Sequence, residues 1–498
     1  MKALLRLAAW AVWGVVLGVA MVMASDGVRV GGLWGSRPNI IVIITDDQGW
    51  GELSCHGNPV LRTPNLDRLH RESVRFTRFH VSPTCAPTRA ALMTGRHEFR
   101  SGVTHTVNER ERLDLAVTTL PELLRRAGYS TGIFGKWHLG DEEEYQPGRR
   151  GFEKAFVHGA GGIGQVFPGS CGDAPGNTYH DPWVRHDGRF ERRRGYCTDV
   201  FVDAAWDWIE SVARRRRPFL AWISPNAPHD PFVSPGEAWE KPYRGRGLPE
   251  MAVRYYAMIA HLDAAVGRLM DRLDGAGLGR ETLVVFMTDN GHSVPGIFNG
   301  GMRGMKGTVY EGGIRVPSFW RWPGRIAAGV DAPQLTAHLD VMPTLLGLAG
   351  ARVPEGVEGR SLVPLLEDVG AAWEERLLFS HLGRWKTGGA KEAMHQQGAV
   401  MGSRYKLVND TELYDLVLDP GETVNRIEAL PGVAARLRTA YREWWEGILG
   451  TAQLHEWSLG PYVNPFRQAF DEQFGGMPTV AEQERMDPTR KFVMDRAR

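Results

Sequence analysis

The run Asn39-Ile-Ile-Val-Ile-Ile44, followed by Thr45-Asp46-Asp47-Gln48-Gly49, decides the fold class of this 498-residue chain. A continuous apolar and β-branched run predicts a strand that is buried on both faces, as in a parallel sheet. Similar runs recur at residues 219–223 and 283–287, and a shorter one lies at 131–134. The polar residues after 39–44 therefore lie at the carboxyl end of a buried strand, where open α/β sheets bind ligands.

Segments with helical patterns lie between these strands. Thr63 and Pro64 predict the start of one helix, with Leu66, Leu69 and Val74 on its apolar face. Further helices are predicted at 118–127, 199–217 and 252–273. The alternation of strands and helices predicts an α/β fold, with a large, mostly parallel central sheet flanked by helices. The four arginines at 214–217 favour a solvated helix end over a polyanion site.

From about residue 375 the pattern changes to short strand-like pieces, at 377–380, 398–401, 405–408 and 412–416. A helix is predicted after them, at 433–449. These elements predict a smaller C-terminal antiparallel sheet plus helix, docked on the main domain. The expected division is a signal peptide at 1–24, a main domain at 37–374, the C-terminal subdomain at 375–450, and a polar tail at 451–498 without an assigned function.

Composition limits the kinds of partner this protein binds, and the N-terminal segment indicates the cellular compartment it occupies. The 59 basic and 58 acidic residues leave a net charge of +1, which argues against nucleic acid as a partner. Lys2 and Arg6 precede an apolar run at 7–23, and Ala24-Ser25 offers a cleavage point. This pattern predicts a secretory signal peptide, with an uncleaved membrane anchor as the alternative. Either way the main body is exported, to the periplasm or the medium.

The strand exits collect residues with chemical function. Asp46 and Asp47 follow the first strand, and Asp289 and Asn290 follow the run at 283–287. Each pair alone is explained by a turn or a cap. Together at one sheet edge they predict a site for a hard cation such as Ca²⁺ or Mg²⁺. The other exits carry Gly135-Lys136-Trp137-His138, Pro225-Asn226-Ala227-Pro228-His229 and, after Asn290, Gly291-His292.

The segment Cys85-Ala86-Pro87-Thr88-Arg89, with Thr94-Gly95-Arg96 after it, is the sharpest motif. With its surroundings the chain resembles the type I sulfatases of the alkaline-phosphatase-like superfamily, from about Arg37 to about Leu430. Further motifs that carry the resemblance are Asp46-Asp47, Thr63-Pro-Asn-Leu-Asp67, Gly135-Lys-Trp-His-Leu-Gly140, Ala227-Pro-His229, Thr288-Asp-Asn-Gly291, Lys306-Gly-x-x-Tyr-Glu-Gly-Gly-Ile-Arg-Val-Pro317, Tyr405-Lys-Leu and Leu413-Tyr-Asp-Leu416.

The resemblance implies that a separate formylglycine-generating enzyme converts Cys85 to Cα-formylglycine before folding. The hydrated aldehyde then attacks sulfur, and its second hydroxyl lets the aldehyde reform as sulfate leaves. It also implies one Ca²⁺ per chain. The ligands implied by the resemblance are Asp46, Asp47, Asp289, Asn290 and the modified residue 85.

The same resemblance assigns roles to the remaining residues. Arg89 orients the gem-diol, where the alternative is an ordinary helix-surface charge. Lys136 and Lys306 neutralise sulfate oxygens. His138 takes the proton of the second hydroxyl, and His229 protonates the departing alcohol. His292 either faces substrate or packs beside the Asn290-Gly291 turn.

The predicted activity is hydrolysis of a sulfate monoester, on a sulfated glycan or an aryl sulfate. The alternatives are a phosphodiesterase or phosphonate monoester hydrolase of the same superfamily, and a non-enzymatic glycan-binding protein. The Gly-rich loop at 158–165 either contacts substrate or is a flexible connection. In an exported protein Cys171 and Cys197 are candidates for a disulfide that leaves Cys55 free.

Overall fold

The structure is a computed structural model that describes residues 32–165, 172–451, 454, 464–476 and 478–479. The predicted signal segment at 1–24 lies outside these residues, as does most of the predicted tail. Within the described ranges, no helix is long and apolar enough to cross a membrane.

A ten-stranded sheet forms the centre of the molecule, in the order β11-β2-β10-β9-β1-β8-β4-β5-β6-β7. The five strands from β9 to β5 in this order are parallel, while β10 joins β9, and β6 joins β5, in antiparallel fashion. The predicted mostly parallel sheet is therefore confirmed. Its strands are β1 (Asn39–Thr45), β2 (Val74–Phe76), β4 (Ser130–Lys136), β5 (Lys154–His158), β6 (Trp183–His186), β7 (Arg189–Arg192), β8 (Phe219–Ser224), β9 (Thr282–Thr288), β10 (Ser318–Arg321) and β11 (Val330–Ala332).

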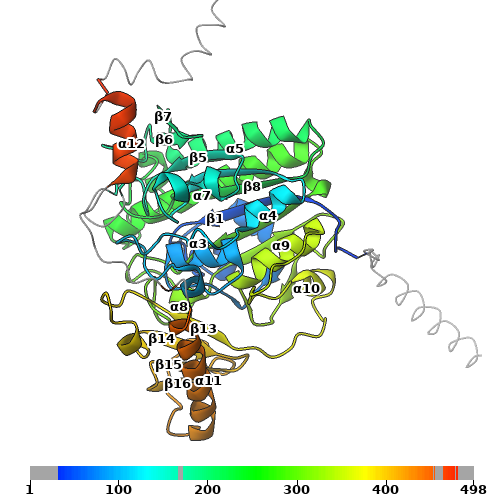
Figure 1. The fold of residues 1–498 in the computed structure, drawn as a ribbon, viewed down its shortest axis with the longest axis vertical. Helices are drawn as coiled ribbons and strands as arrows, with labels where there is room; N and C mark the ends of the chain where they lie inside the picture. Colours follow the sequence, from blue (N-terminus) through cyan, green and yellow to red (C-terminus); the bar gives the residue numbers. More distant parts are fainter. Residues whose placement is uncertain (1–31, 166–171, 452–453, 455–463, 477, 480–498) are drawn as a thin grey trace, which may run out of the picture.

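Helices cover both faces of this sheet (Figure 1). Alternate residues of β1 divide between the two faces: Ile40, Val42 and Ile44 join one core, and Ile41 and Ile43 join the other. The first core includes residues of α3 (Cys85–Thr94), α4 (Leu120–Arg126), α9 (Val341–Ala349) and α10 (Val363–Glu367). The second core includes residues of α2 (Pro64–Arg71), α5 (Cys197–Ala213) and α7 (Glu250–Gly275).

Two predicted helices end earlier than expected. α2 ends at Arg71, and Val74 begins β2 instead of extending the helix. α5 ends at Ala213 instead of Arg217, because Arg216 takes a left-handed φ of 54° and Pro218 disfavours a helical residue before it. All four arginines at 214–217 are exposed, in agreement with a solvated helix end.

The predicted C-terminal antiparallel sheet plus helix is also present. Its strands pair antiparallel in chain order, and α11 (Pro431–Leu449) packs against them. Lys406 ties this sheet to the main domain: its buried ammonium lies 3.1 Å from Glu311 and 2.8 Å from Glu422. The strands are β13 (Leu378–His381), β14 (Gly398–Met401), β15 (Tyr405–Val408) and β16 (Glu412–Asp415).

The described part of the tail forms α12 (Pro465–Phe474), a helix that the sequence analysis did not predict. Its Phe466 and Phe470 are buried against Trp183 and Phe190 of β6 and β7. Figure 1 shows α12 at the β7 end of the sheet, away from α11. The remaining elements are short: β3 (Phe79–His80), β12 (Thr336–Ala337), α6 (Glu237–Glu240), α8 (Glu311–Ile314) and the 3₁₀ turns η1 (Ser54–His56), η2 (Glu98–Ser101), η3 (Glu143–Tyr145), η4 (Pro147–Arg150), η5 (Gly279–Glu281), η6 (His338–Asp340) and η7 (Lys391–Ala393).

Candidate active site

Four neighbouring parallel strands end at one edge of the sheet and deliver the predicted site residues there. The strands are β9, β1, β8 and β4, in that spatial order. Because their carboxyl ends meet at one edge, residues far apart in the sequence become neighbours. The residues that end or follow these strands, all of them buried, are Asp289 and Asn290, Asp46 and Asp47, His229, and Lys136 with His138.

Carboxylates and residue 85 form the centre of the site. One carboxylate oxygen of Asp46, one of Asp289 and the sulfur of Cys85 all lie within 4.8 Å of one another. Asn290 donates from Nδ2 to Asp47 Oδ1 over 2.8 Å. In the described part of the chain, the buried Oδ1 atoms of Asp46 and Asn290 have no hydrogen-bond partner. Buried oxygens without partners in an oxygen-rich cluster are the donor set that hard cations prefer.

Helix α3 presents Cys85 to this cluster from its first residue. The preceding Thr84 is extended, and Pro87 is accommodated in the first turn because it needs no hydrogen-bonded N–H there. Cys85 is 2% exposed, and its sulfur lies 3.3 Å from His138 Nδ1. The positive end of the helix dipole therefore faces the group at position 85.

Arg89 is buried, so it is not a helix-surface charge. Its Nε and Nη2 donate to Asp289 Oδ2 at 3.1 and 2.7 Å. Its Nη1 donates to the Lys136 carbonyl and to Ser224 Oγ, at 3.1 and 2.5 Å. Arg89 therefore joins α3 to the ends of β4, β8 and β9 and orients the Asp289 carboxylate.

The close carboxylates perturb one another. Burial, followed by the charge of Asp46, raises the pKa of Asp289. Burial likewise raises the pKa of Asp46, although Lys136, 2.8 Å away, opposes this effect. Burial also tends to raise the pKa of Asp47. The charge of Lys306, 2.7 Å away, and other nearby charges outweigh this effect, so the pKa of Asp47 lies below its usual value. Asp46 and Asp289 therefore hold a proton more readily than an exposed carboxyl group does, chiefly because they are buried.

The tautomer of neutral His138 follows from its partners. Its Nε2 lies 2.8 Å from the Thr106 carbonyl oxygen, which can only accept, so Nε2 carries the hydrogen. The lone pair of Nδ1 then faces residue 85. Burial, followed by the charge of Lys136, lowers the pKa of His138 well below its usual value. His138 also takes a left-handed φ of 59°, a conformation that is uncommon outside glycine.

His229 faces the cluster from the loop after β8. Its Nε2 lies 3.7 Å from Asp47 Oδ2, and its Nδ1 donates to the Asp230 carbonyl over 2.6 Å. Burial, followed by the charge of Lys306, lowers the pKa of His229. A protonated His229 is therefore a strong acid placed beside the carboxylates.

The Gly-rich loop at 158–165 packs directly on both histidines. A Cβ on Gly161 would lie 2.8 Å from His138 Cε1, and a Cβ on Gly162 would lie 3.0 Å from His229 Nδ1. Side chains at these two positions would crowd the rings. The loop is therefore part of the wall of the site and not merely a connection.

His292 packs beside the turn after β9. Its Nδ1 lies 2.9 Å from the Val294 carbonyl, and its own carbonyl accepts from the backbone N–H of Lys306 over 2.9 Å. The main chain of His292 thus positions Lys306. Of the two alternatives for His292, this geometry favours packing beside the turn.

Several residues support the site although the sequence predicted no role for them. Tyr255 of α7 donates to the Asp47 carbonyl over 2.6 Å, and Tyr179 donates to the His229 carbonyl over 2.5 Å. Asn226 Oδ1 accepts from the backbone N–H of Ile163 over 3.1 Å. Asn226 belongs to the strand exit at 225–229 that the sequence indicated, although no role was predicted for it. The two tyrosines carried no local signal.

Among the described residues, Cys55, Cys85 and Cys197 are free thiols. Cys197 is buried at the start of α5. Cys171, its predicted disulfide partner, lies outside the described residues.

Comparison with known proteins identifies the family. The sequence profile of the family described as "Sulfatase" matches residues 38–351. Human arylsulfatase A is 34% identical over 457 residues, which cover 82% of this chain and 86% of that protein. This chain belongs to the sulfatase family. A second profile, "N-sulphoglucosamine sulphohydrolase, C-terminal", matches residues 304–439 of this sulfatase. Mouse N-acetylgalactosamine-6-sulfatase is 33% identical over 356 residues, 66% of each chain.

Solved structures share the fold. The crystal structure of Ps i-CgsB matches with a TM-score of 0.74 and 24% identity, covering 84% of this chain and 94% of that chain. The structure of BT4656 with its substrate D-glucosamine-2-N,6-O-disulfate matches with a TM-score of 0.66 and 23% identity, covering 84% and 100%. The phosphonate monoester hydrolase of Agrobacterium radiobacter matches with a TM-score of 0.58 and 22% identity, covering 84% and 96%.

The predicted family, fold class and enzyme class are therefore confirmed. The family assignment makes the chain a sulfuric-ester hydrolase, and it overturns the alternative of a non-enzymatic glycan-binding protein.

Proposed function

We propose that this sulfatase cleaves a sulfate monoester to an alcohol and inorganic sulfate where Asp46, Asp289 and Cys85 meet. The observation that carries the proposal is the convergence of one atom from each of these residues within 4.8 Å. Lys136 lies 2.8 Å from Asp46, and Lys306 lies 2.7 Å from the adjacent Asp47. Negative ligands for a cation and positive groups for an anion therefore share one buried place, as transfer of an anionic group requires.

The ligands proposed for Ca²⁺ are Asp46, Asp47, Asp289, Asn290 and the residue at 85. Two observations support a hard cation. The donors of Asp46, Asp47, Asp289 and Asn290 are oxygens, and the Oδ1 atoms of Asp46 and Asn290 have no partner in the described part of the chain. Bound there, the cation would supply positive charge that polarises the sulfate. Among these ligands, Asp289 is oriented by two hydrogen bonds from Arg89.

Cys85 is the proposed site of conversion to Cα-formylglycine by a formylglycine-generating enzyme. The Cys85-x-Pro-x-Arg89 segment and the first-turn position of residue 85 support this. Once formed, the hydrated aldehyde supplies the nucleophilic hydroxyl. A thiol that is 2% exposed meets a modifying enzyme poorly in the folded chain, so modification precedes the packing of α3.

His138 is the proposed base. The lone pair of its Nδ1 faces residue 85 at 3.3 Å, and its Nε2–H is held by the Thr106 carbonyl. Nδ1 is therefore the atom that receives the proton from a hydroxyl at position 85.

His229 is the proposed acid for the leaving alcohol oxygen. Asp47 lies 3.7 Å from its Nε2 and stabilises the imidazolium, whereas burial and Lys306 weaken proton binding. Donation from Nε2 to an alcohol oxygen is therefore favourable once the proton is present. Lys136 and Lys306 are proposed to neutralise the sulfate oxygens as the S–O bond breaks.

A sulfated sugar is the proposed substrate class, with aryl sulfates as model substrates. The names of the relatives support this: one is an N-acetylgalactosamine-6-sulfatase and one is an arylsulfatase. Export to the periplasm or the medium is part of the proposal, and it rests on Lys2 and Arg6 before the apolar run at 7–23.

Tryptic mass spectrometry of the peptide that bears residue 85, from cells with the maturation enzyme, tests the nucleophile. We expect the mass of the aldehyde, and unmodified thiol in a fully active preparation would contradict the mechanism. Kinetics on matched aryl sulfate, phosphodiester and phosphonate substrates test the reaction. A higher kcat/KM on either phosphorus substrate would overturn the sulfate assignment.

Loss of function by substitution tests the site itself. Cys85→Ala and Asp289→Ala are each expected to abolish turnover while circular dichroism shows a folded chain. Wild-type rates in either variant would contradict the assignment of that residue. The matched control is Asp410→Ala, a carboxylate on the turn before β16.

A further inference from the structure

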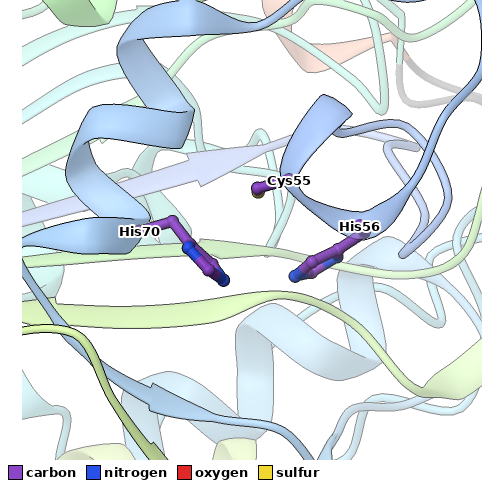
Figure 2. Close-up of side chains that lie close together, drawn as sticks. All are labelled: Cys55, His56 and His70. Atoms are coloured by element: carbon purple, nitrogen blue, oxygen red, sulfur yellow. The ribbon is translucent and has the colours of Figure 1, made fainter.

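A second cluster of metal-ligating side chains lies outside the active site, at Cys55, His56 and His70. The Cys55 sulfur and one ring nitrogen of each histidine all lie within 4.8 Å of one another. Figure 2 shows the thiol and both imidazoles converging from η1 and α2. We propose that these three side chains bind one zinc ion. One thiolate and two imidazoles are typical zinc ligands, and three protein ligands leave a fourth position for water.

The scaffold of the cluster is fixed by Asp67, which lies on α2 three residues before His70. Asp67 Oδ1 accepts from the backbone N–H of Cys55 over 3.0 Å and from Thr63 Oγ1 over 3.1 Å. Its Oδ2 accepts from Ser54 Oγ over 2.7 Å. Thr63 therefore uses its hydroxyl here, and its side chain makes no capping hydrogen bond to α2. Asp67 joins the two elements that supply the ligands, so the cluster forms when η1 docks on α2.

His56 has the tautomer of a metal ligand. Its Nδ1 lies 2.9 Å from the Trp50 carbonyl oxygen, which can only accept, so Nδ1 carries the hydrogen. The lone pair of Nε2 is then available. A backbone carbonyl that holds the second ring nitrogen is the usual outer partner of metal-bound histidine. The ring also stacks on Trp50 at 3.9 Å between centroids, which restricts its rotation.

His70 is held by packing against the same aromatic ring as His56. The centroid of Phe319 lies 5.2 Å from His70 and 5.7 Å from His56, edge-on in both cases. Arg75 Nη1 approaches His70 Nδ1 only to 3.4 Å, and Arg75 is anchored independently by Asp331 at 2.5 Å. If zinc binds Nε2 of His70, the ring hydrogen moves to Nδ1. Nδ1 then no longer accepts from Arg75, and this long contact is lost.

Zinc binding at a thiol displaces one proton. The Cys55 sulfur is a free thiol and lies within 4.8 Å of one ring nitrogen of each histidine. Binding breaks the S–H bond, forms the Zn–S bond and releases one proton to the buffer.

The donor types separate this site from the catalytic one. The catalytic cluster offers carboxylate oxygens together with the Cys85 sulfur and a His229 nitrogen, whereas this cluster offers one sulfur and two imidazole nitrogens without a carboxylate. Saturating Ca²⁺ therefore leaves the Cys55 cluster open to zinc. The experiment measures metal binding, so its result does not depend on whether the proposed catalytic mechanism is correct.

The test is calorimetric titration of the full-length, calcium-saturated protein with Zn²⁺. We expect one zinc per chain and one proton released, seen as a dependence of the heat on buffer ionisation. Loss of an outer-shell partner lowers metal affinity roughly 10–100-fold. Cys55→Ser and His70→Gln each remove a ligand, so each is expected to weaken zinc binding by more than that. His395→Gln changes an exposed histidine outside the cluster and is expected to bind as the parent does.

Cobalt supplies a second signature, because a thiolate ligand gives a charge-transfer band. We expect this band in a Cys85→Ala background, and its loss when Cys55→Ser is added. If Cys55→Ser does not fold, His56→Gln combined with His70→Gln answers the same question through the zinc titration. Absence of zinc binding in the parent, or unchanged binding in the folded variants, would overturn the proposal.

Discussion

Glu52 is a buried carboxyl group whose protonation is linked to folding. It lies in the loop after β1, is 0% exposed, and neither side-chain oxygen has a hydrogen-bond partner in the described part of the chain. Burial raises the pKa of Glu52 from 4.5 to about 8. The folded chain therefore keeps this proton between those two values, whereas the unfolded chain loses it.

The sign of the effect follows from proton binding. Between pH 4.5 and about 8 the folded state binds one proton more than the unfolded state, so stability falls as the pH rises. The slope is about 1.4 kcal/mol per pH unit, which gives about 3 kcal/mol at pH 7. Unfolding entropy is about 2.1 cal/mol/K per residue, so for a chain of this size the effect is about 3 °C in Tm.

Glu52→Gln removes the titrating group and nearly preserves its shape. We expect its Tm to match that of the parent near pH 4.5 and to exceed it by about 3 °C at pH 7, measured by scanning calorimetry in calcium buffer. Glu446→Gln, an exposed change on α11, is the matched control and leaves the pH dependence unchanged. If the difference in Tm between Glu52→Gln and the parent stayed constant from pH 5 to pH 8, protonation of Glu52 would not be linked to folding.

Three further predictions follow from the site and its supports. Gly161→Ala places a Cβ 2.8 Å from His138 and is expected to lower kcat about 100-fold in steady-state kinetics. The control Gly148→Ala has open space around its Cβ and is expected to leave kcat unchanged. Equal kcat values in both variants would exclude crowding of His138. Lys406→Met removes the ammonium that buried Glu311 and Glu422 share, and it is expected to cost about 3–5 kcal/mol in urea unfolding. A loss no larger than that of exposed Lys391→Met would contradict this. Calcium removal by chelation is expected to lower Tm, because Asp46, Asp47 and Asp289 then repel one another. An unchanged Tm together with retained activity would argue against a cation at these residues.

The central strands were predictable because their sequences are continuous apolar runs. β1, β8 and β9 extend the predicted segments by one or two residues at most. The outer strands were missed, since a strand such as β7 has only four residues and three of them are charged. These short strands form by pairing with a neighbouring strand, and the local sequence pattern does not predict such pairing.

The site residues were predictable to the extent that strand ends determine them. Asp46, Asp289, Lys136 and His229 lie where the topology requires, although their catalytic roles stay predictions. The contacts of Tyr255 and of the glycines at 161 and 162 depend on how a distant helix and loop pack. Sequence periodicity contains no information about such contacts.

The docking of α12 on β7 has a consequence for solubility. β7 is the last strand of the ten-stranded sheet, and Gln473 both donates to and accepts from the main chain of Phe190, over 2.8 Å in each case. A side-chain amide thereby occupies the place where a foreign strand would add to the sheet. Shortened chains that end before residue 464 would leave this edge and the aromatic rings beneath it open to self-association, so expression trials are best run with the whole C-terminal segment.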